Sequence, residues 1–308
     1  MNGKINFLTR TTCELRNEPI NDCRKYWEKV IRLKDHESGL GEFDVYFCPR
    51  CSLGFTDPYP TEETTAFLYD SKESADFDVI KNTIIDKIKD FLSRRQIIRI
   101  AQPHKHINSV LDYATGNGRF AMQSAKVFPN ACIHAVDYQD APPQHLLDED
   151  VRVNYFNLKD FGELNQKYDL IFLRHVLEHT HHPIELLNNL AKRLNPNGIL
   201  YVEVPNLHSG CAKLFGKNWN SYYVPRHIYH YTIRSLKEIV TTAGLRAEIG
   251  KNEMPLMGNT ISILTGLDKS NFLVQCMGAL LFPIQILIEV FYGSSTCINA
   301  RCRHVEQE

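Results

Sequence analysis

The sequence predicts an α/β protein with a doubly wound, mainly parallel sheet, and three observations support this. Strand-like apolar runs alternate with helix-like segments from about residue 106 onward. Two of the runs, residues 110–112 and 132–137, end in an acidic residue. Small residues follow the first acid and lead into a predicted helix, a layout typical of a nucleotide site at the carboxyl edge of a parallel sheet.

The individual elements are predicted from periodicity and from helix end signals. Residues 1–60 are expected to be irregular and residues 61–105 to be helical, ending at Pro103. Strands are predicted at 109–114, 132–137, 151–156, 168–173, 198–204 and 245–250. Helices are predicted at 118–128, 183–194 and 232–243. Thr232 is the expected N-cap of the last helix, and Gly244 is its stop.

Composition excludes some classes of partner. The 308 residues are 43% hydrophobic, which is enough for a full core and an appendage. A formal net charge of −1 provides no basic face, so nucleic acid is not expected as the main partner. The N-terminus lacks an apolar signal core and the nine cysteines are an odd number. We therefore expect a cytoplasmic protein whose thiols stay reduced or bind metal.

Two cofactors compete for the loop after the first strand. Gly116, Gly118 and Ala121 fit a dinucleotide fingerprint, which would make the chain an NAD-dependent oxidoreductase. The same loop also has Asp112 followed by small residues at every second position. A carboxylate there would repel a pyrophosphate and attract the ammonium of a methionyl group. The acid therefore favours S-adenosylmethionine.

Three motifs make the chain resemble the class I S-adenosylmethionine-dependent methyltransferases. They are L-D-Y-A-T-G-N-G-R-F at 111–120, L-R-H-V-L-E-H at 173–179 and P-R-H at 225–227. The resemblance covers about residues 109–250 and implies a Rossmann-like seven-stranded sheet. Ala114 stands where the family usually has glycine, and alanine fits this turn only if its φ stays negative. A catalytically silent binding protein with this fold therefore remains an alternative.

The resemblance also implies the cofactor-binding residues. Asp112 would orient the methionine part, and the backbone of Ala114, Gly116 and Gly118 would lie along it. Asp137 would bind the ribose. The remaining candidates are Tyr138 beside the adenine, Asn157 and Leu158 at its border, and Arg174, which either contacts the cofactor or forms a surface ion pair.

The histidine of P-R-H, His227, is the implied general base, since histidine accepts protons near neutral pH. His175 is expected near the reaction centre, and Tyr222 in the acceptor wall. Arg226 would suit an anionic acceptor, such as a phosphate or a carboxylate. We expect a small-molecule acceptor, namely a sugar, a sugar nucleotide or a lipid-linked glycan precursor, with O-methylation favoured over C-methylation.

An N-terminal module is expected at 1–60, followed by a helical connector at 61–105 and a methyltransferase core at 106–252. Cys48 and Cys51 form half of a zinc-ribbon pattern, and Cys13 and Cys23 would complete a structural site. In the family a second C-x-x-C pair often stands near Cys13, but here its second position is arginine. Bound zinc and a metal-free relic ribbon both stay open.

A seventh strand is expected at 294–308, so residues 253–293 would form an insertion beside the active site. Its apolar part, 272–292, is about long enough to span a bilayer, but Gln275, Pro283, Gln285 and Glu289 interrupt it. A buried hairpin or dimer contact is favoured. A lid or membrane-surface element for a lipid-linked acceptor and a transmembrane helix are the alternatives.

Overall fold

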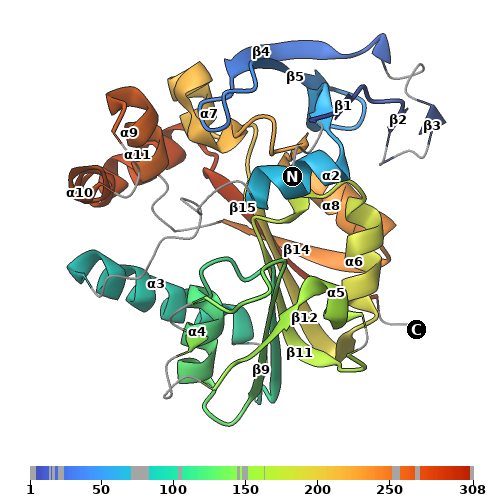
Figure 1. Cartoon of the computed structure of the whole chain (residues 1–308), viewed down its shortest axis with the longest axis vertical. Helices are drawn as coiled ribbons and strands as arrows, with labels where there is room; N and C mark the ends of the chain where they lie inside the picture. Colours follow the sequence, from blue (N-terminus) through green and yellow to red (C-terminus); the bar gives the residue numbers. More distant parts are fainter. Residues whose placement is uncertain are drawn as a thin grey trace.

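The computed structural model describes residues 5–13, 15, 18–19, 24–70, 83–102, 106–143, 146–147, 152–162, 164–251, 257–267 and 271–305. Its centre is a seven-stranded sheet in the order β10-β9-β8-β11-β12-β15-β14 (Figure 1). The strands are β8 (Ser109–Tyr113), β9 (Cys132–Asp137), β10 (Asn154–Asn157), β11 (Tyr168–Arg174), β12 (Leu194–Pro205), β14 (Leu245–Lys251) and β15 (Cys297–His304). Neighbours pair in parallel except around β15, which is antiparallel to both β12 and β14. The predicted doubly wound sheet is confirmed.

Helices cover both faces of this sheet (Figure 1). One face carries α3 (Ile84–Ala101) and α4 (Arg119–Val127), and the other carries α5 (Leu158–Phe161), α6 (Pro183–Ala191) and α8 (Ile233–Thr242). A separate hydrophobic core lies on each face, because central strands of a parallel sheet are apolar on both sides. The predicted cap is confirmed: the Thr232 side chain accepts a hydrogen bond from the backbone N–H of Ser235.

One helix boundary differs from the prediction. Helix α6 ends at Ala191, and β12 begins at Leu194 instead of at residue 198. The Asn-Pro-Asn-Gly segment therefore lies inside the strand, where the pairing with β11 shifts between Tyr168 and Leu170. A Cβ at Gly198 would lie 2.8 Å from the carbonyl oxygen of Tyr168, so the bulge requires glycine. A turn signal in the sequence is thus used here as a β-bulge.

The expectation that residues 1–60 are irregular is wrong. A four-stranded antiparallel sheet in the order β13-β6-β5-β4 is formed mainly from this segment. Its strands are β4 (Glu28–Lys34), β5 (Glu42–Cys48), β6 (Leu53–Asp57) and β13 (Tyr229–His230), and two short pairs join β1 (Phe7–Leu8) to β7 (Tyr59–Pro60) and β2 (Thr12–Cys13) to β3 (Glu18–Pro19). Strand β13 comes from the loop that contains His227, so this sheet holds that loop in place.

Helix α2 (Glu62–Asp70) follows the N-terminal sheet and lies at the carboxyl edge of the central sheet (Figure 1). The Tyr69 hydroxyl is 2.8 Å from Nδ1 of His179, and the Tyr69 ring stacks with Tyr138. Tyr138 directly follows β9, and His179 is the last residue of the 3-10 turn η2 (Leu177–His179), which comes after β11. The N-terminal part of the chain therefore covers the edge at which the two acidic residues lie.

The described part of the segment between β14 and β15 forms helices α9 (Met257–Thr265), α10 (Phe272–Leu280) and α11 (Phe282–Tyr292). They pack beside α7 (Gly210–Phe215) and the 3-10 turns η3 (Gly216–Asn218) and η4 (Asn220–Tyr222). Ile261 and Val274 join one apolar cluster with Trp219 and Tyr222. None of the helices in the described ranges is both long and apolar enough to cross a bilayer.

Candidate active site

The loop between β8 and α4 has a left-handed backbone at three alternating positions. The φ angles are 55° at Ala114, 57° at Gly116 and 73° at Gly118. The expectation of a negative φ at Ala114 is therefore wrong: the turn takes the glycine conformation although the residue is alanine. An L-residue pays roughly 1–2 kcal/mol for this conformation. At Gly118 a Cβ would lie 2.8 Å from Leu146, so only glycine fits there.

Asp112 is buried at the end of β8 and holds this loop against α4. Its Oδ2 accepts hydrogen bonds from the Thr115 hydroxyl at 2.6 Å and from the backbone N–H of Ala121 at 3.1 Å. Burial raises the pKa of Asp112 to about 6, against the lowering effect of the Thr115 bond. Thr115 was not singled out in the sequence, although its position three residues after the acid allows this bond.

Asp137 connects the ends of β8 and β9. Its Oδ2 accepts the backbone N–H of Gly116 at 2.7 Å, and its Oδ1 accepts that of Tyr138 at 2.8 Å. Burial raises the pKa of Asp137, while the two backbone bonds lower it. The carboxylate therefore fixes the small-residue loop at the position where a ribose would meet it.

Tyr138 projects from this edge with 48% of its surface exposed. Its ring stacks with Tyr69 at a centroid distance of 6.3 Å and an interplanar angle of 23°. Asn157 is the N-cap of α5, and its Nδ2 donates to the carbonyl oxygen of Tyr138 and to Asp140. The Asn157 side chain thus shapes the loop that carries Tyr138.

Leu158 lines a cavity on the helical face of the sheet. With Tyr113, Phe161 and Arg193 it lines a cavity of about 620 Å³ between α5 and α6. The guanidinium of Arg193 stacks on Phe161 and donates to the carbonyl oxygens of Phe161 and Gly162. The structure therefore places Leu158 in a groove on the helical face, directly after Asn157, which is paired with Asp137 in the sheet.

A buried charge network lies at the ends of β11 and β12. Arg174 and Glu203 are neighbours in register, and the Arg174 Nη2 is 3.1 Å from Glu203 Oε1. His175 lies between Glu203 and Glu178, at 3.4 and 3.3 Å. Although desolvation opposes protonation, these two carboxylates raise the pKa of His175 to about 9. His175 is therefore a cation that anchors Glu178, and Arg174 forms an internal ion pair while it stacks on Phe120.

Glu203 completes this network and was missed in the sequence. Its side chain is fully buried and also accepts hydrogen bonds from Gln96 and Tyr201. Desolvation would raise its pKa, but Arg174 and His175 lower the pKa of Glu203 to about 2. A single acid within the apolar run I-L-Y-V-E-V was the available signal, because a lone charge in a buried strand requires a partner.

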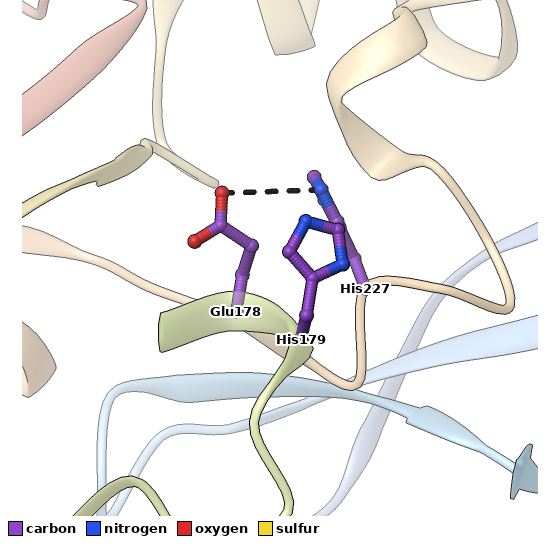
Figure 2. Close-up of side chains that lie close together, drawn as sticks. All are labelled: Glu178, His179 and His227. Atoms are coloured by element: carbon purple, nitrogen blue, oxygen red, sulfur yellow. Dashed lines mark ion pairs between the residues drawn. The ribbon is translucent and has the colours of Figure 1, made fainter. Parts of the chain in front are cut away.

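Glu178, His179 and His227 converge beside this network (Figure 2). Nε2 of His227 is 3.9 Å from Oε1 of Glu178, while Nδ1 of His227 is 2.8 Å from the carbonyl oxygen of Ser221. Since a carbonyl oxygen only accepts, Nδ1 carries the proton and Nε2 has a lone pair. Burial and neighbouring histidines lower the pKa of His227 well below its usual value. His227 is thus a neutral base that faces a carboxylate.

The same three side chains could also hold a divalent metal ion. Each offers one ligand atom, and these atoms lie within 4.8 Å of one another. Oε2 of Glu178 is buried and has no hydrogen-bond partner. Nδ1 of His179 lies 3.1 Å from the carbonyl oxygen of Arg226. Oε2 of Glu178 and Nε2 of His227 are acceptor atoms here, which fits either a hydroxyl proton or a cation.

Tyr223 lies beside these histidines, whereas the predicted Tyr222 packs into the core. The Tyr223 ring is 5.3 Å from that of His227 and 6.3 Å from that of His179. Tyr222 is 5% exposed, contacts Trp219 edge to face, and burial raises its pKa to about 12. A one-residue difference decides this, since η4 turns successive side chains to opposite sides.

Three of the four predicted zinc ligands are buried in the N-terminal module. Sγ of Cys13 lies 3.4 Å from Sγ of Cys51. A hydrogen bond with Cys51, together with burial, raises the pKa of Cys48. Cys23 lies outside the described residues.

The comparisons with known proteins agree with this geometry. A family model described as a methyltransferase domain matches residues 85–248, which is more than half of the chain. Methyltransferase str3 of Strobilurus tenacellus is 27% identical over 173 residues, covering 52% of this chain and 60% of the relative. The chain thus matches less than two thirds of that relative's length.

Among solved structures, the plantazolicin methyltransferase BpumL in complex with a substrate analogue and SAH is similar at 16% identity and a TM-score of 0.48, covering 79% of this chain and 90% of that chain. The mitomycin 7-O-methyltransferase MmcR is similar at 12% identity and a TM-score of 0.47, covering 71% and 54%. The family match, and with it the strand order, decides between the two cofactors considered for the loop. The chain belongs to the methyltransferase domain family.

Proposed function

We propose that the chain transfers the methyl group of S-adenosylmethionine to a hydroxyl oxygen of a small molecule, with His227 as the general base. The observation that carries this proposal is the fixed tautomer of His227. Its Nδ1–H is committed to the Ser221 carbonyl, so its Nε2 lone pair faces the site beside Glu178. A hydroxyl must lose its proton during transfer, whereas an amine often does not need a base beforehand.

The residues present fit the cofactor. The bound sulfonium would supply an activated methyl group with a good leaving group. The left-handed loop from Ala114 to Gly118 allows close approach of the backbone, and Asp137 offers its carboxylate at the end of β9. Tyr138 and Tyr69 would flank the adenine from two sides. The protein's contribution to rate is then mainly alignment of acceptor and methyl group.

Glu178 would stabilise the charge that forms on His227. His227 is neutral at rest, and it becomes an imidazolium as the acceptor loses its proton. A carboxylate at 3.9 Å then attracts the new cation in a buried, weakly screened environment. His175, a cation held between Glu178 and Glu203, would position Glu178 and would not itself act as a base.

The acceptor class is proposed as a sugar, a sugar nucleotide or a lipid-linked glycan precursor. The apolar helices support the lipid-linked variant, because Leu280, Leu287, Val290 and Phe291 are between 67% and 84% exposed. An exposed apolar face of this size suits the boundary of a lipid surface. Co-sedimentation with anionic and neutral vesicles tests this: binding that Leu287→Asp and Phe291→Asp abolish supports it, and no sedimentation contradicts it. A cytoplasmic location stays a prediction.

A structural zinc ion in the N-terminal module is also proposed. Cys51 contacts both of the other buried thiols, since its Sγ lies 3.4 Å from that of Cys13 and it shares a hydrogen bond with Cys48, and thiolates are preferred zinc ligands. Such a site would hold the strands that cover the His227 loop. It would not take part in the methyl transfer.

Calorimetric titration tests the central proposal. S-adenosylmethionine and its demethylated product are titrated into the wild-type protein and into Asp137→Ala, with NAD as the control ligand. Micromolar binding that is weakened in the variant supports the proposal. Failure to bind either compound, or preference for NAD, contradicts it. Binding without turnover of any hydroxyl acceptor, and with no effect of His227→Ala, would favour a catalytically silent protein.

A further inference from the structure

Arg226 is a buried cation that has no carboxylate partner among the residues that the structure describes. Its side chain is 1% exposed. Nη2 donates to the Ser38 hydroxyl at 2.8 Å and to the Leu68 carbonyl oxygen at 3.2 Å. Nε and Nη1 are buried without a hydrogen-bond partner. No carboxylate in the described ranges forms an ion pair with its guanidinium.

This situation is costly for a guanidinium, which stays charged at all accessible pH values. The rings of Tyr223 and Tyr69 offer partial compensation at 5.3 and 6.0 Å. Arg10 provides a comparison inside the same molecule. It is also buried, and its Nε and Nη2 likewise have no hydrogen-bond partner, while Nη1 donates to the Tyr229 hydroxyl at 2.7 Å. The two arginines differ in their aromatic contacts: three rings lie within 5.1 Å of the Arg10 guanidinium, whereas Arg226 has two rings at 5.3 and 6.0 Å.

The position of Arg226 connects it with the proposed acceptor site. The Tyr223 ring lies 5.3 Å from the Arg226 guanidinium and 5.3 Å from the His227 ring. Tyr69 similarly contacts both Arg226 and His179. Tyr69 and Tyr223 are only partly buried, so they mark the side from which a ligand would reach the guanidinium.

We propose that Arg226 binds an anionic group of the acceptor, a phosphate or a carboxylate, next to Tyr69 and Tyr223, while the reacting hydroxyl approaches His227. This inference rests on the proposed function and names the chemical class of its substrate. Phosphate and carboxylate oxygens match guanidinium donors in geometry and charge. The anion would supply the missing counter-charge, so its binding should also stabilise the fold.

Thermal unfolding with simple anions tests the site without knowledge of the acceptor. Inorganic phosphate and acetate are titrated at constant ionic strength against sodium chloride, with and without the demethylated cofactor product. We expect the wild-type Tm to rise by roughly 3 °C when the anion concentration is about 100 times its Kd. Arg226→Met should lose this rise, Arg226→Lys should retain part of it, and the matched control Arg10→Met should retain it fully.

Arg226→Met also separates a binding role from a structural one. Without added anion its Tm should equal or exceed that of the wild type, because replacing an uncompensated buried charge by an apolar side chain of similar length is often neutral or stabilising. A markedly lower Tm, together with no anion effect on the wild type, would overturn the proposal. An equal anion effect in Arg226→Met and wild type would overturn it too, since the anion would then bind elsewhere.

Calorimetric titration of the demethylated cofactor product into the same protein distinguishes failure of the proposed methyltransferase function from failure of the proposed anion site. Loss of cofactor binding would contradict the proposed function whatever phosphate does. Normal cofactor binding without any phosphate or acetate effect would leave the methyltransferase proposal intact and remove the anionic acceptor.

Discussion

Nε2 of His227 and Oε1 of Glu178 face each other at 3.9 Å, and both side chains are buried. Two acceptor atoms at this separation repel each other slightly until a proton comes between them. The pair is therefore arranged to receive a proton, and its electrostatics favour the state that follows proton transfer.

Replacing His227 should abolish most of the chemistry and leave the cofactor bound. We expect His227→Ala to lower kcat by roughly 10²- to 10⁴-fold, the usual contribution of a general base. Cofactor affinity, measured by calorimetry, should stay within about twofold. His182→Ala is the matched control, because His182 is exposed and pairs with the exposed Glu62. A fall in kcat below tenfold for His227→Ala would exclude its role as the base.

Glu178→Gln should make His227 still harder to protonate. Burial already lowers the pKa of His227 well below 6.5, and loss of the neighbouring carboxylate removes the attraction for an imidazolium. An NMR titration of the His227 ring should therefore show its midpoint at lower pH in the variant than in the wild type. A midpoint that moves upward would contradict the proposed pairing.

Stability should fall on acidification below about pH 6.5. Burial lowers the pKa of His227, and it lowers the pKa of His230 to about 3. The unfolded chain then binds more protons than the folded one, so the free energy of unfolding decreases by up to about 1.4 kcal/mol per pH unit for each histidine. Urea unfolding at pH 7, 6 and 5 measures the slope. The free energy of unfolding should depend less steeply on pH in His230→Gln than in the wild type. In His182→Gln the slope should equal that of the wild type.

Ala114→Gly should stabilise the protein. The φ of 55° costs alanine roughly 1–2 kcal/mol, of which glycine's extra unfolded-state entropy cancels about half. We expect a net gain near 0.5–1 kcal/mol and equal or tighter cofactor binding. Ala121→Gly is the control: it lies inside α4 and should lose about 1 kcal/mol. Destabilisation by Ala114→Gly would mean that the methyl group packs in a way that offsets the strain.

Asp137→Asn should weaken cofactor binding by about 10- to 100-fold, since it removes the charge that accepts the Gly116 and Tyr138 N–H groups. Asp169→Asn provides the comparison. Asp169 also accepts backbone N–H groups, those of Asn108 and Ser109, but at the opposite edge of the sheet. Equal losses in both variants would point to general destabilisation.

Zinc content tests the N-terminal module. Metal analysis of the purified protein should give about one zinc per chain, and Cys48→Ser and Cys51→Ser should remove it. Cys302→Ser changes a cysteine that is buried in the central sheet and should leave the zinc content unchanged. Absence of zinc from the wild type would leave the module as a metal-free fold.

Much of the central sheet was predictable because its strands are continuous apolar runs and its helices carry clear caps, as at Thr232. The N-terminal sheet was not. Strand β4 reads E-K-V-I-R-L-K with one buried residue, and strand β13 has only two residues, Tyr229 and His230. Strand β13 pairs with β6, which lies more than 170 residues earlier in the chain, and local periodicity carries no information on such contacts.

The site residues also fall into those that the sequence predicts and those that it does not. Asp112, Asp137 and His227 follow from motif spacing, since each ends an apolar run or lies in a short motif. Glu203 depends on the register that places it opposite Arg174, and the choice of Tyr223 over Tyr222 depends on a single 3-10 turn. The conformation of Ala114 is set by the surrounding loop and overrides the preference of the residue itself.

The position of β15 has a consequence for synthesis. This strand lies between β12 and β14, so β12 has an open edge and β14 has no partner strand in this sheet until residues 297–304 leave the ribosome. Open edges of this kind pair readily with other chains. The nascent protein therefore needs β15 before β12 is covered and β14 can join the sheet.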